Sequence, residues 1–133
     1  MTKIKIPEDC GNSPRQAFLK EFNTAFGKGN AEFIIDHVSE DIVWWIYGDK
    51  KLEGKDAFAK EVYSMKEYVA DEMILHHIIT HGRTASANGE IRMARKNYAF
   101  CDVYRFTGAK GSIIREIHSY VIETKAEPAL EDK

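Results

Sequence analysis

The chain has 133 residues, of which 44% are hydrophobic and 30% are charged, and its formal net charge is −2. This composition is typical of one folded domain and predicts no basic surface for nucleic acid. No apolar run approaches the ~20 residues that span a membrane, and the N-terminus lacks the apolar core of a signal peptide. We therefore expect a cytoplasmic protein with no nucleic-acid or membrane partner. It is expected to form a single domain over residues 1–133, with its core at about 14–123 and flexible termini at 1–12 and 124–133.

Ser13 and Pro14 predict the start of a first helix, because serine caps helix N-termini and proline suits the first turn. The apolar residues that follow recur at helical spacing and form one stripe: Phe18, Phe22, Ala25 and Phe26. Gly27 and Gly29 are expected to end this helix. A second, shorter helix is predicted over residues 31–38.

A strand is predicted over residues 41–48, DIVWWIYG, with a Gly-Asp turn at its end. A third helix is expected from about Lys55, because Phe58, Val62 and Met65 follow at helical spacing.

Four strands follow from Met73, centred on ILHHIIT, TASANGEIRM, YAFCDVYRF and SIIREIHSYVIE. Asn88-Gly89 predicts a bulge or a further turn in the second of them. Helices followed by a run of antiparallel strands predict an α+β domain.

Asp102 lies in the middle of AFCDVYRF, a strand of aromatic and β-branched residues. A buried, unpaired carboxylate costs several kcal/mol or takes up a proton instead. If Phe106 pairs with Ser112 in the last hairpin, Asp102 lies opposite Glu116. The same register brings two more pairs to that face: Phe100 with His118, and Tyr98 with Tyr120. A slip of one residue would redistribute these pairs.

Asp102 is the leading candidate for a catalytic residue, because a carboxylate pair with Glu116 in a dry pocket would keep one proton near neutral pH. His118 is the second candidate, since it would lie close enough to exchange protons with Asp102. The alternatives are an Asp102 that pairs with an arginine or reaches solvent, a His118 bonded within the wall, and a Glu116 on an exposed rim. Tyr120 either offers its phenol to a ligand or packs at the end of the sheet.

The opposite face of this hairpin is also apolar, with Ala99, Cys101, Val103, Ile113, Ile117 and Val121. Three helices can cover only one face of the sheet. We therefore expect the uncovered face to form a homodimer interface.

Three stretches, FNTAFGKGN, SEDIVWWIYG and CDVYRFTGAKGSIIREIHSYV, resemble the superfamily of nuclear transport factor 2, the SnoaL-type polyketide cyclases and ketosteroid isomerase. The resemblance covers residues of about 14–123. It implies a cystatin-like cone in which three N-terminal helices pack on a curved antiparallel sheet and enclose a pocket. It also implies dimerisation through the outer face of the sheet.

By this resemblance, Asp102 matches the aspartate that ketosteroid isomerase keeps protonated in its oxyanion hole. Phe22 replaces the isomerase's tyrosine, and Trp45 or a near neighbour replaces its general base. Steroid isomerisation by that mechanism is therefore not expected, although other members use other acids in the same pocket. Trp45, Phe22 and Phe100 are expected to line the pocket, with simple core filling as the alternative for the first two.

No metal or cofactor is expected, because His76 and His77 face opposite sides of a strand and Cys10 and Cys101 lack ligand spacing. The predicted function is acid–base chemistry of an isomerase, cyclase, hydratase or lyase type on a mostly apolar small molecule. The alternative is a non-catalytic ligand-binding or dimerisation domain of the same fold.

Overall fold

The computed structural model describes residues 2–7, 13–108 and 110–125. Cys10 and the segments 8–12 and 126–133 of the termini expected to be flexible lie outside the described residues. The helices are α1 (Pro14–Lys28), α2 (Ala31–Ile35) and α3 (Lys55–Ser64). The strands are β1 (Lys3–Lys5), β2 (Val38–Ile46), β3 (Lys50–Glu53), β4 (Glu72–His81), β5 (Thr84–Met93), β6 (Lys96–Phe106) and β7 (Ile114–Thr124).

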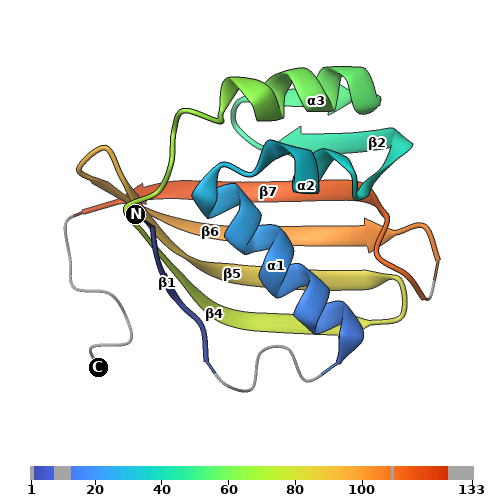
Figure 1. The fold of residues 1–133 in the computed structure, drawn as a ribbon, viewed down its shortest axis with the longest axis horizontal. Coiled ribbons are helices and arrows are strands. Elements are labelled where there is room, and N and C mark those ends of the chain that lie inside the picture. The colour runs from blue at the N-terminus through green and yellow to red at the C-terminus, as the bar shows by residue number, and fades with distance from the viewer. Residues whose placement is uncertain (1, 8–12, 109, 126–133) are drawn as a thin grey trace.

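The described strands form one curved sheet in the order β1-β4-β5-β6-β7-β2-β3. The helices lie on one side of it, with α1 crossing the sheet and α2 and α3 next to β2 (Figure 1). We call this side the inner face and the opposite side the outer face. The expected α+β fold is confirmed. The sheet is mixed, however, because β1 pairs with β4 and β2 pairs with β7 in parallel.

The ends of α1 follow from local chemistry. The hydroxyl of Ser13 accepts a hydrogen bond from the backbone N–H of Gln16 at 3.2 Å. Gly29 ends the helix in the left-handed conformation with φ of 76°, whereas Gly27 lies inside the helix. The predicted second helix is too long, because the chain is already in strand β2 at Val38.

The two edge strands of the sheet, β1 and β3, are short and were not predicted from the sequence. β1 lies in the segment expected to be flexible, yet it pairs with β4. The adjacent Thr2 is buried, and its hydroxyl donates to the carbonyl of Ala70 at 2.6 Å. β3 pairs with β2 beyond the Gly48-Asp49 turn.

The hairpin of β6 and β7 contains a bulge next to its loop. Phe106 lies opposite Ile114, but the preceding residue of β6, Arg105, lies opposite Glu116. One residue of β7 is therefore unpaired. This irregularity lets both Ile114 and Ile117 face the core, where they are 0% and 2% exposed, although strict alternation would turn them to opposite faces.

The predicted register of this hairpin is wrong. Asp102 lies opposite Ser119 and not opposite Glu116, and Phe100 lies opposite Val121. The third predicted pair, Tyr98 with Tyr120, is likewise replaced by Tyr98 with Glu123. Because the slip is an odd number of residues, the β7 side chains expected beside Asp102 point to the outer face.

A second bulge lies in β4, next to the predicted Asn88-Gly89 irregularity of β5. Leu75 lies opposite Gly89 and His77 lies opposite Asn88, so one β4 residue has no partner. A Cβ atom at Gly89 would collide with the backbone carbonyl of Ile74. Glycine is therefore required where the bulged strand approaches its neighbour.

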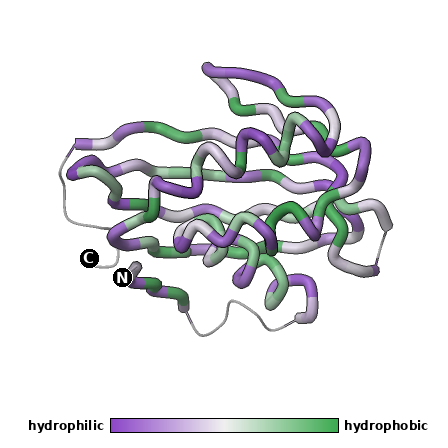
Figure 2. Tube along the Cα trace, turned by 45° about the horizontal axis from the view of Figure 1, so that its top comes forward, coloured by the Kyte–Doolittle hydropathy of each residue, from purple (hydrophilic) through white to green (hydrophobic). Residues whose placement is uncertain are grey.

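Hydrophobic segments occur in both the helices and the strands (Figure 2), and the buried ones meet in the layer between them. The largest fully buried side chains include Phe22, Phe58, Tyr104 and Phe106. Of the described helices, none has the length and apolar character needed to cross a membrane.

Candidate functional site

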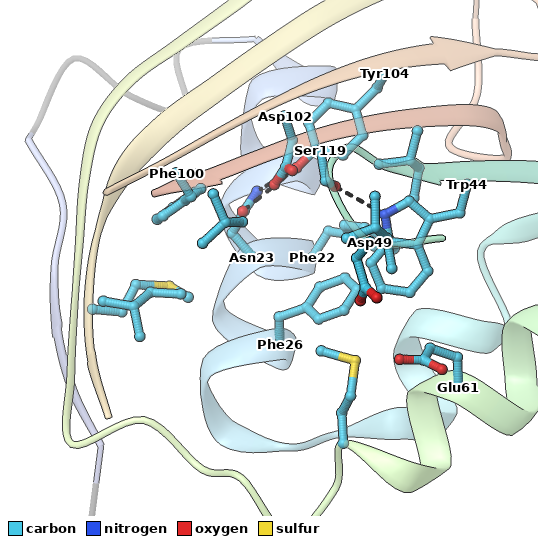
Figure 3. A pocket seen from close by; sticks show the side chains of 16 residues that line it. Phe22, Asn23, Phe26, Trp44, Asp49, Glu61, Phe100, Asp102, Tyr104 and Ser119 are labelled. Carbon is cyan, nitrogen blue, oxygen red and sulfur yellow. Dashed lines mark hydrogen bonds between the residues drawn. The ribbon is translucent and has the colours of Figure 1, made fainter. Parts of the chain in front are cut away.

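A cavity of about 240 Å³ lies between the helices and the inner face of the sheet (Figure 3). Its volume is below the ~300–1,000 Å³ of pockets for drug-sized ligands, so it suits a compact ligand. Apolar side chains from several elements form most of the wall: Phe22 and Phe26 of α1, Trp44 and Ile46 of β2, Phe100 of β6 and Ile117 of β7.

The carboxyl group of Asp102 lies in this cavity with hydrogen-bonding side chains on two sides. The phenol of Tyr104 donates to Asp102 Oδ2 at 3.4 Å. On the neighbouring strand, Ser119 Oγ accepts a hydrogen bond of 2.8 Å from Trp44 Nε1. The Ser119 proton is therefore available to Asp102, which Ser119 faces across the β6–β7 pair.

Asn23 extends this network from helix α1. Its side-chain nitrogen donates to the carbonyl of Leu19 at 2.9 Å and to the hydroxyl of Tyr104 at 3.1 Å. The Tyr104 hydroxyl accepts from Asn23, and its own proton has two acceptors within reach, Asp102 Oδ2 at 3.4 Å and Asn23 Oδ1 at 3.5 Å. Figure 3 shows Asn23, Tyr104, Ser119 and Asp102 gathered at one side of the pocket.

Burial raises the pKa of Asp102 to about 6, and the hydrogen bonds from Ser119 and Tyr104 limit this rise. Burial, together with the negative charge of Asp102, also holds the pKa of Tyr104 well above its usual range. Near neutral pH, Asp102 therefore exchanges a proton readily, while Tyr104 remains a neutral hydrogen-bond donor.

Of the other predicted site residues, Phe22 and Phe100 line the cavity with Asp102. Trp45 does not, because its neighbour Trp44 is the tryptophan that faces inward. Val43 and Tyr47, which lie on the same side as Trp45 by alternation, are not part of the lining either.

Glu116, His118 and Tyr120 lie on the outer face, away from Asp102. There His118 stacks on Trp45 with ring centroids 4.3 Å apart, and its Nε2 lies 3.2 Å from Glu116 Oε1. Tyr120 stacks on Tyr47 at 4.7 Å. The sheet separates these groups from the cavity, so the predicted carboxylate pair and the proton exchange between His118 and Asp102 have no geometric basis.

Four residues of the site were not predicted from the sequence: Asn23, Trp44, Tyr104 and Ser119. Two of them could have been predicted from sequence patterns. Asn23 lies on the apolar stripe of α1, between Leu19 and Phe26. Tyr104 shares a strand face with Asp102 because side chains alternate along a strand. Ser119 could not be found without the bulge that sets the register of β7.

Two further acids, Asp49 and Glu61, lie at the edge of the cavity nearest α3 (Figure 3). Glu61 Oε1 forms an ion pair of 3.2 Å with Lys50 Nζ. Asp49 is exposed, so this edge of the cavity reaches solvent. We call Asp49 and Glu61 the acidic rim.

The sequence profile of the SnoaL-like domain matches residues 19–116 of the chain. No curated protein matches the sequence closely enough to count as a relative. Several solved structures share the fold. An NTF2-like protein of unknown function from Cytophaga hutchinsonii is 18% identical with a TM-score of 0.65, and the match covers 81% of this chain and 89% of that one.

Two of the similar structures are described as enzymes. The epoxide hydrolase/cyclase-like enzyme SalBIII, of pyran ring formation in salinomycin, is 17% identical with a TM-score of 0.67, over 81% of this chain and 90% of its own. An LEH-like epoxide hydrolase from M. tuberculosis is 15% identical with a TM-score of 0.66, over 80% of this chain and 76% of its own. At these identities the likeness shows the fold alone.

Proposed function

The chain belongs to the SnoaL-like domain family, and we propose that it catalyses acid–base chemistry on a compact, mostly apolar molecule bound in the cavity, with Asp102 as the proton carrier. The reaction would be of the isomerase, cyclase, hydratase or lyase type. The observation that carries this proposal is a carboxyl group with a pKa of about 6 at the wall of an apolar cavity.

A carboxyl group with this pKa suits proton transfer in both directions. Near neutral pH both of its forms are populated, so Asp102 can take a proton from one atom of the ligand and return it to another. The Tyr104 phenol can donate a hydrogen bond to a ligand oxygen on which negative charge develops. The apolar wall excludes water and strengthens both interactions.

Proteins that share the fold include the epoxide hydrolase/cyclase-like enzyme and the epoxide hydrolase described above, which supports chemistry of this general kind. The ketosteroid-isomerase mechanism itself is not proposed, because Phe22 lines the cavity where that enzyme's tyrosine is expected, and β2 presents Trp44. A small cavity also favours a ligand more compact than a steroid.

The first test is the titration of Asp102, by carbon NMR of its labelled carboxyl group with Asp102→Asn to assign the signal. We expect a midpoint well above the ordinary value of about 4. The second test is a panel of enone, epoxide and lactone substrates, on which Asp102→Asn should abolish turnover. The exposed Asp71→Asn, which makes the same change outside the cavity, should turn over like the wild type.

An ordinary midpoint, or full activity in Asp102→Asn, would contradict the proposal. A raised midpoint with ligand binding but no turnover would instead favour the non-catalytic ligand-binding domain.

We also propose that a second copy of the chain covers the outer face of the sheet. This face carries stacked aromatic side chains, of which Tyr47 and Tyr120 are 46% and 47% exposed. Around them it carries both signs of charge, because Arg105 lies opposite Glu116 in the register of β6 and β7. A twofold axis would place like aromatic surface together and let opposite charges meet.

A further inference from the structure

Every charged residue that lines the cavity is an acid. Asp49 comes from the β2–β3 turn, Glu61 from α3 and Asp102 from β6. The negative charges are therefore distributed around the cavity and do not all come from one element. No lysine or arginine belongs to the lining within the part of the chain that the structure describes. The cavity is therefore more favourable for a cation than for an anion.

The two rim acids differ in their partners. Glu61 pairs with Lys50, whose side chain is 43% exposed, so its charge is partly neutralised from the solvent side. Asp49 is held by the turn, where its backbone N–H donates to the carbonyl of Ile46 at 3.0 Å. Its carboxylate makes no hydrogen bond or ion pair with any other side chain that the structure describes. The acidic rim therefore holds two carboxylates against the single ammonium group of Lys50, and Asp49 is the carboxylate without a side-chain partner among the described residues.

Aromatic rings lie between the rim and the buried network. Trp44 and Phe26 both line the cavity, with ring centroids 5.9 Å apart and planes at 62°. Figure 3 shows the carboxylates of Asp49 and Glu61 on the same side of the pocket as these two rings. An ammonium group there meets carboxylates and aromatic faces together, a combination that stabilises cations.

We propose that the ligand of this cavity is a compact apolar molecule that carries a basic amine. Its ammonium group would lie at the acidic rim near Asp49, and its apolar body would fill the cavity toward Asp102. This inference rests on the proposed function of the same cavity and specifies the class of its substrate. It also predicts that carboxylic acids of the same size are rejected, because no cation of the lining would pair with them.

Three probes that share a ring test the charge preference: cyclohexylmethylamine, cyclohexylmethanol and cyclohexanecarboxylate. Their dissociation constants are measured by calorimetry with the full chain near neutral pH and at low salt. We expect the amine to bind about fivefold or more tighter than the alcohol, and the carboxylate to bind more weakly than either. Added salt should reduce the preference for the amine, because Asp49 is exposed.

The variant Asp49→Asn separates the rim from the rest of the cavity. It should lower the ratio of amine to alcohol affinity by about fivefold while leaving the affinity for the alcohol unchanged. Asp71→Asn, at an exposed site outside the cavity, should keep the wild-type ratio. Glu61→Gln should have a smaller effect than Asp49→Asn, because Lys50 already pairs with Glu61.

An alcohol that binds as tightly as the amine would overturn this inference, as would an unchanged ratio in Asp49→Asn. Failure of all three probes to bind would overturn it as well. None of these outcomes decides the proposed function, because the titration of Asp102 requires no ligand. If the titration midpoint of Asp102 is raised but the cavity does not prefer the amine, the proposed proton transfer by Asp102 is retained and the substrate is neutral.

Discussion

Asp102 holds its ionisable group among apolar side chains, so the charge on this residue changes the free energy of unfolding. Burial raises its pKa in the folded chain to about 6, against about 3.9 for an unfolded aspartate. Between these values the folded chain holds more protons than the unfolded chain. The contribution of Asp102 to stability is therefore fully present below the lower value and is lost as the pH rises through the upper one.

We expect Asp102→Asn, which remains neutral, to escape this loss. Its free energy of unfolding should equal that of the wild type near about pH 4 and exceed it by on the order of 3 kcal/mol above about pH 7. Urea unfolding of both proteins across this range measures the difference. Asp71→Asn, an exposed control, should show no such gain. A difference that stays constant with pH would contradict the raised pKa.

At the scale of single residues, the sequence contains part of the site. Asp102 is recognisable because an acid interrupts a strand of aromatic and β-branched residues, and the structure places it in the cavity. Asn23 could have been predicted from its helical spacing, and Tyr104 from its alternation with Asp102 along the strand. His118 and Glu116 were assigned to the wrong face, because alternation alone does not reveal where an extra residue enters a strand.

At the scale of elements, the bulge in β4 depends on one glycine. The substitution Gly89→Ala places a methyl group against the backbone carbonyl of Ile74, which no side-chain rotation can relieve. We expect a loss of about 3 kcal/mol in the free energy of unfolding, measured by urea or thermal denaturation.

Gly108→Ala is the matched control for this change, because an added Cβ there has its nearest neighbour at an ordinary 3.7 Å. It should alter stability by no more than a few tenths of a kcal/mol. If both alanine variants unfold at the same urea concentration, the close approach of β4 and β5 at Gly89 does not contribute to the free energy of unfolding, and the prediction is wrong.

The helices and the longer strands were predictable because their signals are local. Ser13 and Gly29 set the start and the end of α1 through their own capping preferences. The alternation of apolar residues indicates the strands. β1 and β3 have 3 and 4 residues, too few to show a period. The register of β7 depends on the burial of Ile114 and Ile117 against segments far away in sequence, and local patterns do not contain that information.

At the scale of the whole molecule, the outer face predicts a dimer. We expect the wild type to sediment with twice the mass of the chain at micromolar concentration. Tyr120→Glu should sediment as a folded monomer, because the twofold axis would bring the new charges of both copies into the apolar interface.

Tyr68→Glu is the control for this experiment, since Tyr68 is 63% exposed and lies outside the sheet. It should remain a dimer. A wild type that sediments as a monomer under the same conditions would remove the proposal of a second copy on this face.

The cavity is assembled from both ends of the chain, which matters for its synthesis. Trp44 and Ser119, whose side chains bond across β2 and β7, are 75 residues apart in sequence. A ribosome that adds ~5–20 residues per second needs roughly 4–15 seconds to cover that distance. Throughout this interval Phe22 and Trp44 exist without the strand that completes their enclosure. The unfinished chain therefore exposes apolar side chains that the folded protein buries, which is the condition that favours aggregation.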